Sequence, residues 1–178
     1  ARNPYIADLN DHLIRKLDLA GFVPTVAGTG AQGFSGDGGP ATSAQLDSPA
    51  GVAVDAAGDI YIADTHNQRI REVKGGTITT VAGGAVAGYA GDGGLAASAL
   101  LSSPTALAVD GSGNLYIADT DNHRIRKITG TTIATVAGDG EQTFSGDGGG
   151  ATSAGIDSPS GVGVDAKGKI YIGDTHKQ

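Results

Sequence analysis

Short runs of apolar residues alternate with turn residues along the whole chain. The runs are rich in Val, Ile, Leu and Ala, and the segments between them contain Gly, Asp and Asn. Runs this short, bounded by such turns, are typical of β-strands, because an amphipathic helix needs a longer stretch with the helical period. The pattern therefore predicts an all-β protein.

The clearest unit lies in residues 51–82. Its four predicted strands read GVAVD, IYIA, RIREV and TITTVA, at residues 51–55, 60–63, 69–73 and 77–82. The turns at 57–59 and 75–76 contain residues that tolerate the positive φ of tight hairpins. Hairpins that join four consecutive strands give an antiparallel, four-stranded meander.

This unit returns with a period of 55 residues. Val-Ala-Gly begins at residues 26, 81 and 136, and Ser-Pro begins at residues 48, 103 and 158. The approximate repeats are 26–80, 81–135 and 136–178, the last completed by 1–25, within a single domain of residues 1–178. A lone four-stranded sheet cannot bury both faces, whereas radially stacked copies can, so the period predicts a β-propeller with about three blades per chain.

A Gly-rich insert separates the fourth strand of each unit from the first strand of the next. The three inserts occupy residues 28–49, 83–104 and 138–159. Pro40 suits the first position of a helix, so we expect a turn or two of helix through Leu46, ended by Ser48-Pro49. Asp37 precedes this segment and is expected to cap it.

Two segments carry a family resemblance. PAGVAVDAAGDIYIADTHNQRIREV and PTALAVDGSGNLYIADTDNHRIRKI resemble NHL repeats, in which an apolar strand ending in Asp is followed by YIAD, an Asn-His turn and a strand with Arg. The turn pair varies here, as Asn122-His123, Asn67-Gln68, Asp11-His12 and Lys177-Gln178. The resemblance implies a propeller, often six-bladed, that mostly acts in binding, although a few related propellers are enzymes.

The insert GFSGDGGPATSAQL resembles a bacterial variant of the same repeat, found in large secreted or surface proteins. This resemblance implies a bacterial protein that is secreted, periplasmic or on the cell surface.

Composition and charge limit the classes of binding partner that the sequence favours. The chain has 31 Gly, no Cys, Met or Trp, and a formal net charge of -7. A negative average field disfavours nucleic acid and anionic membrane surfaces as partners. The absence of Cys excludes disulfides and thiolate chemistry, and no apolar run is long enough to cross a membrane.

Charged residues recur at fixed places in the units. An Asp follows the second strand of each unit and is interpreted as a cap of the next turn; these residues are Asp8, Asp64, Asp119 and Asp174. Arg69 and Arg71 lie two residues apart and so project from one face of a strand, as do Arg124 and Arg126. We expect them to pair with acidic residues of a neighbouring blade rather than to bind phosphate.

The sequence predicts no metal site and no cofactor. The four His residues, 12, 66, 123 and 176, lack the short spacing of a zinc site. Asp37, Asp92 and Asp147 sit between glycines and could hold calcium, but the spacing of acidic residues in an EF-hand loop is absent. Calcium therefore stays an alternative to a purely structural role.

No catalytic residues are predicted. The sequence has no nucleophile elbow, Walker loop or paired carboxylates, and near-identical units offer the same groups in rotation rather than different groups at one point. Alternate ends of an antiparallel meander share a side, so the inserts and the turns after the second strands should form one loop-rich face. Its predicted ligand-binding residues are Phe34, Ser35, Asp37, His66, Asn67, Tyr89, Asp92, Asn122, His123, Phe144, Ser145 and Asp147.

These observations favour a non-catalytic scaffold that binds a protein or a glycan through the loop-rich face. One alternative is a lyase or hydrolase with a metal in the propeller channel, although the predicted channel strands carry mainly Gly, Ala, Val and Leu. Another is a fragment of a longer structural repeat array.

The chain ends also carry a prediction about assembly. The N-terminal region supplies a second strand at 5–8, a third at 13–17 and a fourth at 25–27; the C-terminal region supplies a first strand at 161–165 and a second at 170–173. Closed propellers need about four to eight blades. We therefore predict a head-to-tail homodimer that forms a six-bladed ring, with the strand at 5–8 displaced by its duplicate.

Overall fold

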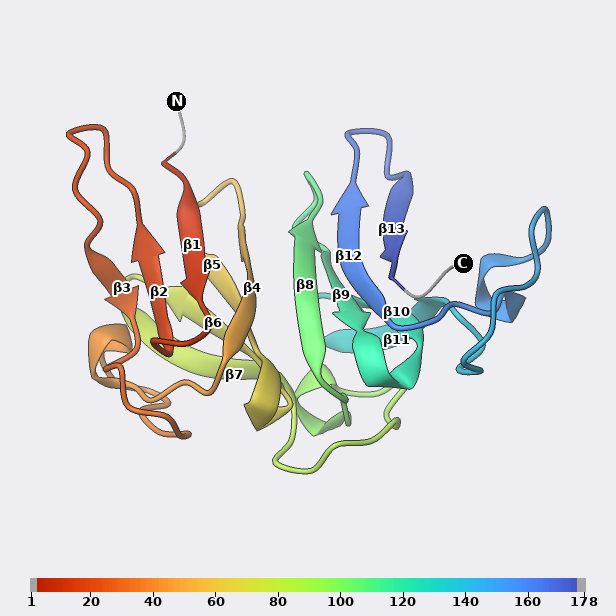
Figure 1. The fold of residues 1–178 in the computed structure, drawn as a ribbon, viewed down its shortest axis with the longest axis horizontal. Coiled ribbons are helices and arrows are strands. Elements are labelled where there is room, and N and C mark those ends of the chain that lie inside the picture. Colours follow the sequence, from red (N-terminus) through yellow and green to blue (C-terminus); the bar gives the residue numbers. More distant parts are fainter. Residues whose placement is uncertain (1–2, 176–178) are drawn as a thin grey trace.

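The computed structural model describes residues 3–175, which form four antiparallel sheets (Figure 1). The N-terminal sheet holds β1 (Tyr5–Asp8), β2 (Leu13–Lys16) and β3 (Thr25–Ala27). The first full blade holds β4 (Pro49–Val54), β5 (Ile60–Asp64), β6 (Arg69–Lys74) and β7 (Thr77–Gly83). The second full blade holds β8 (Pro104–Val109), β9 (Leu115–Asp119), β10 (Arg124–Thr129) and β11 (Thr132–Ala137), and the C-terminal sheet holds β12 (Pro159–Val164) and β13 (Ile170–Asp174).

The order of strands confirms the predicted meander, since within each sheet every strand pairs with the next strand along the chain. The turn between β4 and β5 shows why the hairpins form. Asp55 Oδ1 accepts the amide N–H groups of Ala57, Gly58 and Asp59, each at 2.9 Å. Gly58 adopts a φ of 93° that glycine tolerates. The carboxylate and the glycine together fix this turn.

Apolar side chains from facing sheets fill the spaces between them. Ile62 and Ile78 of the first full blade pack in one cluster with Ile14 of the N-terminal sheet. Ile70 of the same blade packs with Ile117 of the second full blade. The strands closest to the axis approach tightly, because a Cβ on Gly51 of β4 would lie only 2.4 Å from the Thr105 carbonyl oxygen of β8.

The predicted helix in the insert is wrong in length and in its cap. The structure has a single 3-10 turn, η1 (Ala41–Ser43), after which Ala44 is extended; Pro40 occupies the N-cap position rather than the first helical position, and neither Asp37 nor another side chain caps the turn. The chain leaves the helical conformation after this turn because the end of the insert bonds its own beginning: Gln45 N–H donates to Ser35 Oγ at 3.2 Å, and Gly33 N–H donates to the Leu46 carbonyl oxygen at 3.1 Å. Before the turn the insert pairs with β7, where Gly38 N–H donates to the Ile78 carbonyl oxygen at 2.8 Å and Ile78 N–H to that of Gly39 at 3.0 Å. The other inserts contain equivalent turns, η3 (Ala96–Ser98) and η5 (Ala151–Ser153).

Each insert of a full blade therefore covers the outer edge of that blade. The next insert repeats the pattern, with hydrogen bonds of 2.8 and 3.1 Å between Ile133 of β11 and the backbone of Gly93 and Gly94. In the single chain, β1 remains paired with β2, from Tyr5 opposite Lys16 to Asp8 opposite Leu13. No helix among residues 3–175 is long and apolar enough to cross a membrane.

Candidate functional site: the loop face

The inserts of the two full blades lie at the lower end of Figure 1, together with the short turns η2 (Thr65–Asn67) and η4 (Thr120–Asn122). The hairpins that join β4 to β5 and β12 to β13 lie at the opposite end. We call the lower surface the loop face. Its position agrees with the arrangement that the meander predicts.

A buried arginine forms hydrogen bonds with both the first insert and the blade that this insert covers. Arg71 on β6 is fully buried, and its Nη1 donates to Asp64 Oδ2 at 3.1 Å. Its Nη2 donates to Asp37 Oδ1 at 2.7 Å and to the Ser35 carbonyl oxygen at 3.1 Å. One guanidinium thus joins the blade and the insert that covers it.

The second full blade repeats this arrangement. Arg126 is also fully buried, and it donates to Asp119 at 3.1 Å and to Asp92 at 2.6 Å. The expectation that these arginines pair with a neighbouring blade is therefore wrong. Both carboxylate partners belong to the arginine's own blade or to the insert that covers it, because the planar guanidinium can bridge two acceptors that lie on one side of the strand.

Asp64 links the insert to the blade at a second point. Its Oδ1 accepts the Asp47 N–H at 2.7 Å and the Asn67 Nδ2 at 2.9 Å. Burial raises the pKa of Asp64, and these hydrogen bonds and the charge of Arg71 oppose that rise. The prediction that this Asp caps the backbone of its own turn is confirmed for Asp8, which accepts the Asp11 N–H at 3.4 Å, but not for Asp64 or Asp119. The turn after Asp174 lies mostly outside the described residues.

At the other full blade and the C-terminal sheet, the carboxylate again binds the end of the insert. Asp119 accepts the Ser102 N–H at 2.7 Å, and Asp174 accepts the Asp157 N–H at 3.0 Å. The insert reaches these carboxylates because it ends at the first strand of the next sheet, β8 or β12, whose beginning lies beside them.

In each of the two inserts that cover a full blade, one aromatic ring lies on an arginine pair. The Phe34 ring centre is 3.9 Å from Arg69 Cζ and 4.7 Å from Arg71 Cζ. The Tyr89 ring is 3.8 Å from Arg124 Cζ. Phe34 is 40% exposed and Tyr89 43% exposed, so each ring packs on cations while much of its surface faces solvent. We call these two rings the aromatic platforms.

Asp92 is held by several donors. Its Oδ2 accepts the Thr135 N–H and the Tyr89 hydroxyl, both at 3.0 Å. Burial alone would raise the pKa of Asp92, but the hydrogen bonds from Thr135, the charge of Arg126 and the Tyr89 hydroxyl together lower it. Asp37 has a similar role, accepting the Thr80 hydroxyl at 2.7 Å.

The predicted Asn residues of the loop face also hold the inserts. Asn67 Nδ2 donates to the Gly33 carbonyl oxygen at 2.8 Å, and Asn122 Nδ2 to that of Gly88 at 2.7 Å. The side-chain amides of both residues are therefore hydrogen-bonded within the protein. His66 differs, because its side chain is 61% exposed and lies 3.5 Å from Asp47.

The residue after each Asn position joins neighbouring sheets, which the sequence did not indicate. His123 Nδ1 accepts the Ser158 N–H at 3.1 Å, and His12 Nδ1 accepts the Ser48 N–H at 3.0 Å. At the equivalent position, the Gln68 side-chain oxygen accepts the Ser103 N–H at 2.6 Å. His12, Gln68 and His123 have two features in common: each side chain can accept a hydrogen bond, and each residue has a positive φ, between 53° and 57°.

The third insert carries the same residue types in a different setting. Ser145 Oγ accepts the Gly155 N–H at 3.3 Å, as Ser35 Oγ accepts the Gln45 N–H at 3.2 Å. Phe144 and Asp147 are exposed. His176 and the pair Lys177-Gln178 lie outside the described residues.

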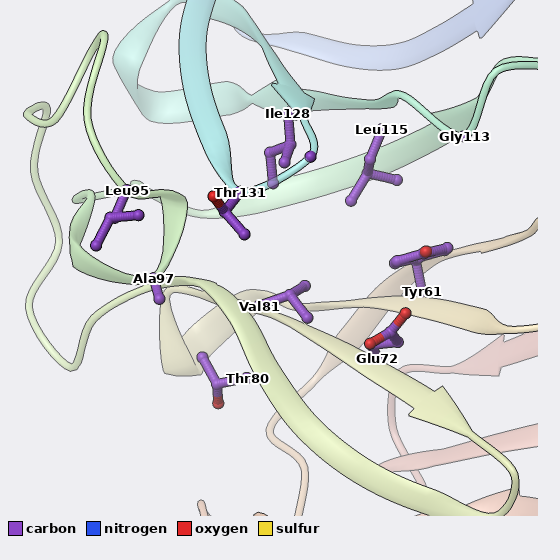
Figure 2. Close-up of a pocket in the computed structure, with 11 residues that line it drawn as sticks. Tyr61, Glu72, Thr80, Val81, Leu95, Ala97, Gly113, Leu115, Ile128 and Thr131 are labelled. Carbon is purple, nitrogen blue, oxygen red and sulfur yellow. The ribbon is translucent and has the colours of Figure 1, made fainter.

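A cavity of about 400 Å³ lies between the two full blades, away from the predicted residues (Figure 2). Tyr61 and Glu72 lie on one side of it, and apolar side chains such as Leu115 and Ile128 lie on the other. Burial and the neighbouring Glu72 carboxylate raise the pKa of Tyr61 to about 12, so its phenol stays protonated. Sequence reasoning missed the cavity because its walls come from two different units.

Among residues 3–175, no three His, Cys, Asp or Glu side chains are grouped closely enough to hold a metal ion.

Comparison with known proteins identifies the repeated unit. Residues 46–72 and 101–128 match the NHL repeat, and each match runs from the end of an insert into the third strand of the blade that follows, β6 or β10. The chain contains NHL repeats. Its NHL sheets adopt the blade arrangement of β-propellers, which are also the solved structures that it resembles.

Among sequence relatives, this NHL chain is 35% identical over 136 residues to Protein SUPPRESSOR OF QUENCHING 1, chloroplastic, from Arabidopsis thaliana. It is 36% identical over 156 residues to mouse teneurin-1. These matches cover 71% and 72% of this chain but only 13% and 6% of those proteins. The chain therefore corresponds to a small part of each relative.

Among solved structures, a Bacteroides thetaiotaomicron protein of unknown function aligns over 94% of this NHL chain with a TM-score of 0.69 and 21% identity. A streptogramin B lyase aligns over 97% with a TM-score of 0.61 and 14% identity, and a gluconolactonase from Xanthomonas campestris over 97% with 0.62 and 17%. This chain covers 40%, 45% and 50% of those three chains. At sequence identities this low, the structural alignments establish a shared fold and nothing further.

Proposed function

We propose that this NHL chain is a non-catalytic scaffold that binds a protein or a glycan through the aromatic platforms of its loop face. The observation that carries the proposal is the exposure of Phe34 and Tyr89, each backed by two arginines. Rigid aromatic side chains supply contact area at little entropic cost, and they are enriched among the residues that dominate binding energies.

This proposal retains only some of the ligand-binding residues that the sequence predicts. Asp37, Asp92, Asn67 and Asn122 already bond within the structure, so they position the inserts rather than contact a ligand. The platforms recur once per blade, which suits a ligand that is itself extended or repetitive. The lyase and the gluconolactonase share the fold, and a shared fold alone does not carry an activity to this chain.

The test is a binding screen with two probes, an oligosaccharide array and a peptide-display library. The variant with both Phe34→Ala and Tyr89→Ala should bind any ligand of the wild type at least about tenfold more weakly. Phe22→Ala is the matched control, because Phe22 is also an exposed aromatic but lies in the loop between β2 and β3.

Circular dichroism should show that the double variant keeps its fold. If the folded double variant binds every wild-type ligand with unchanged affinity, the platforms are not the binding surface and the proposal fails.

A further inference from the structure

The cavity between the two full blades has a charged group on one wall and an apolar surface on the other (Figure 2). Glu72 and Tyr61 lie together on the wall from the first full blade, and Leu115 and Ile128 lie on the wall from the second. The volume of about 400 Å³ falls within the range of small-molecule sites in proteins. Both walls belong to complete four-stranded sheets, so the cavity does not arise from an unfinished blade.

In the sheets on either side of the first full blade, a lysine lies opposite the tyrosine of this hairpin. Lys16 pairs with Tyr5, and Lys127 pairs with Tyr116. The two ammonium groups lie over their tyrosine rings, 5.9 Å and 5.2 Å from the ring centres. The repeated hairpin thus places an ammonium group on a tyrosine, an arrangement that cation–π attraction stabilises.

The first full blade departs from this pattern, because Glu72 occupies the lysine position opposite Tyr61. Within residues 3–175, no cation lies over the Tyr61 ring and Glu72 forms no ion pair. Lys74, two residues further along β6, bonds Asp59 at 2.5 Å instead. Tyr61 therefore has a carboxylate beside it where its counterparts have an ammonium group.

The surroundings of Tyr61 are electrostatically suited to a cation. Three carboxylates add to the effect of burial in raising the pKa of its phenol, those of Glu72, Asp55 and Asp59. The nearby ammonium group of Lys74 balances only one of them, so the local charge favours a cationic ligand over an anionic one. The Tyr61 hydroxyl interacts with the Glu72 carboxylate, whose remaining oxygen lone pairs can accept an ammonium donor.

We propose that this cavity binds a small organic ammonium ion, a protonated amine with an apolar body. Its cationic group pairs with Glu72, in the place beside the tyrosine that lysine has in the neighbouring sheets, and its apolar body packs on Leu115 and Ile128. The charge-assisted hydrogen bond fixes the orientation of the ligand, and burial of the apolar body adds affinity. The site is separate from the aromatic platforms, since neither Phe34 nor Tyr89 lines the cavity.

Titration calorimetry of the whole chain with phenethylamine tests the proposal, and phenethyl alcohol serves as the uncharged analogue of similar shape. The amine should bind with a dissociation constant below about 1 mM and at least about tenfold more tightly than the alcohol. Glu72→Gln removes the charge and keeps the shape of the side chain. It should weaken binding of the amine at least about tenfold and leave binding of the alcohol within about threefold.

Glu141→Gln is the matched control, because it makes the same change of charge at an exposed residue of the third insert. It should leave the affinity for the amine unchanged. Glu72→Lys is a second variant at the site, and it should abolish amine binding because its own ammonium group takes the place of the ligand. Lysine at the equivalent positions 16 and 127 indicates that the fold accepts this change, and circular dichroism should confirm it.

Amide NMR spectra locate the bound amine independently of its affinity. The amine should shift the signals of Gly113, Gly130 and Thr131, which line the cavity, more than that of Phe34 on the loop face. Such shifts, with binding lost in both Glu72 variants and kept in Glu141→Gln, would support the proposal. Binding of the amine no tighter than that of the alcohol, unchanged binding in the folded Glu72 variants, or shifts confined to other surfaces would overturn it.

Discussion

At the scale of single residues, the buried arginines organise the loop face. Arg71 and Arg126 each bind one carboxylate of the blade and one of the insert. A buried guanidinium is stable only when its donors are paired, so the positions of the two inserts are tied to these side chains. The rings of the aromatic platforms pack on the same two arginines. The positions of these exposed rings therefore depend on the buried guanidinium groups.

We expect Arg126→Met to lower the free energy of unfolding by about 3–5 kcal/mol, because it leaves the fully buried Asp119 carboxylate without its cation. Urea unfolding at neutral pH and low protein concentration measures this. The matched control is Arg15→Met, where the arginine and its partner Asp8 are 32% and 30% exposed, and the expected loss is under about 1 kcal/mol. Equal losses at the two positions would show that burial does not set the strength of the pair.

Asp92→Asn should reduce stability at neutral pH by about 1 kcal/mol, allowing for solvent screening of this partly exposed group. The pKa of Asp92 is lowered in the folded state, so its contribution is present above the unfolded value of about 3.9 and is lost as pH falls through the folded value. The difference between wild type and variant should therefore shrink in acid. Asp147→Asn is the control, since Asp147 is exposed.

The same variant addresses calcium. Asp92 is already bonded to Arg126 and Thr135, so added calcium should leave the melting temperature of the wild type unchanged. A rise with calcium that Asp92→Asn abolishes would instead identify the Gly-Asp-Gly segments as metal sites.

At the scale of elements, sequence reasoning succeeded where conformation is local and failed where it is not. The strands and hairpins follow from alternation and turn residues, such as Asp55 and Gly58, that act within a few positions. The insert forms one 3-10 turn rather than a longer helix because Gln45 and Leu46 bond Ser35 and Gly33 at the beginning of the insert, which lie too far away in the sequence for a local pattern to indicate. Likewise, the sequence indicates that Arg71 needs an acidic partner but not which carboxylate the fold brings to it.

Close approach of strands at the axis gives a prediction at this scale. Gly51→Ala should cost about 1–3 kcal/mol, because the added Cβ meets the Thr105 carbonyl oxygen of β8 and the two blades must move apart. Gly163→Ala on β12 is the control. No atom lies within 4 Å of a Cβ there, and alanines occupy the equivalent positions 53 and 108. Thermal unfolding of the two variants should separate them; similar melting temperatures would contradict the tight contact.

At the scale of the whole molecule, the period alone was enough to predict stacked, four-stranded sheets. The cavity beside Tyr61 was not predictable, since its walls come from two units that no local pattern connects. The contacts of His12 and His123 with the next sheet were missed for the same reason. The homodimer stays a prediction.

The position of the insert has a consequence for how such arrays grow. Each insert of a full blade covers the outer strand of the blade that follows it, so a segment of one period carries its own edge protection. A tandem duplication of that segment adds a blade without presenting a bare strand edge, the feature through which β-proteins aggregate.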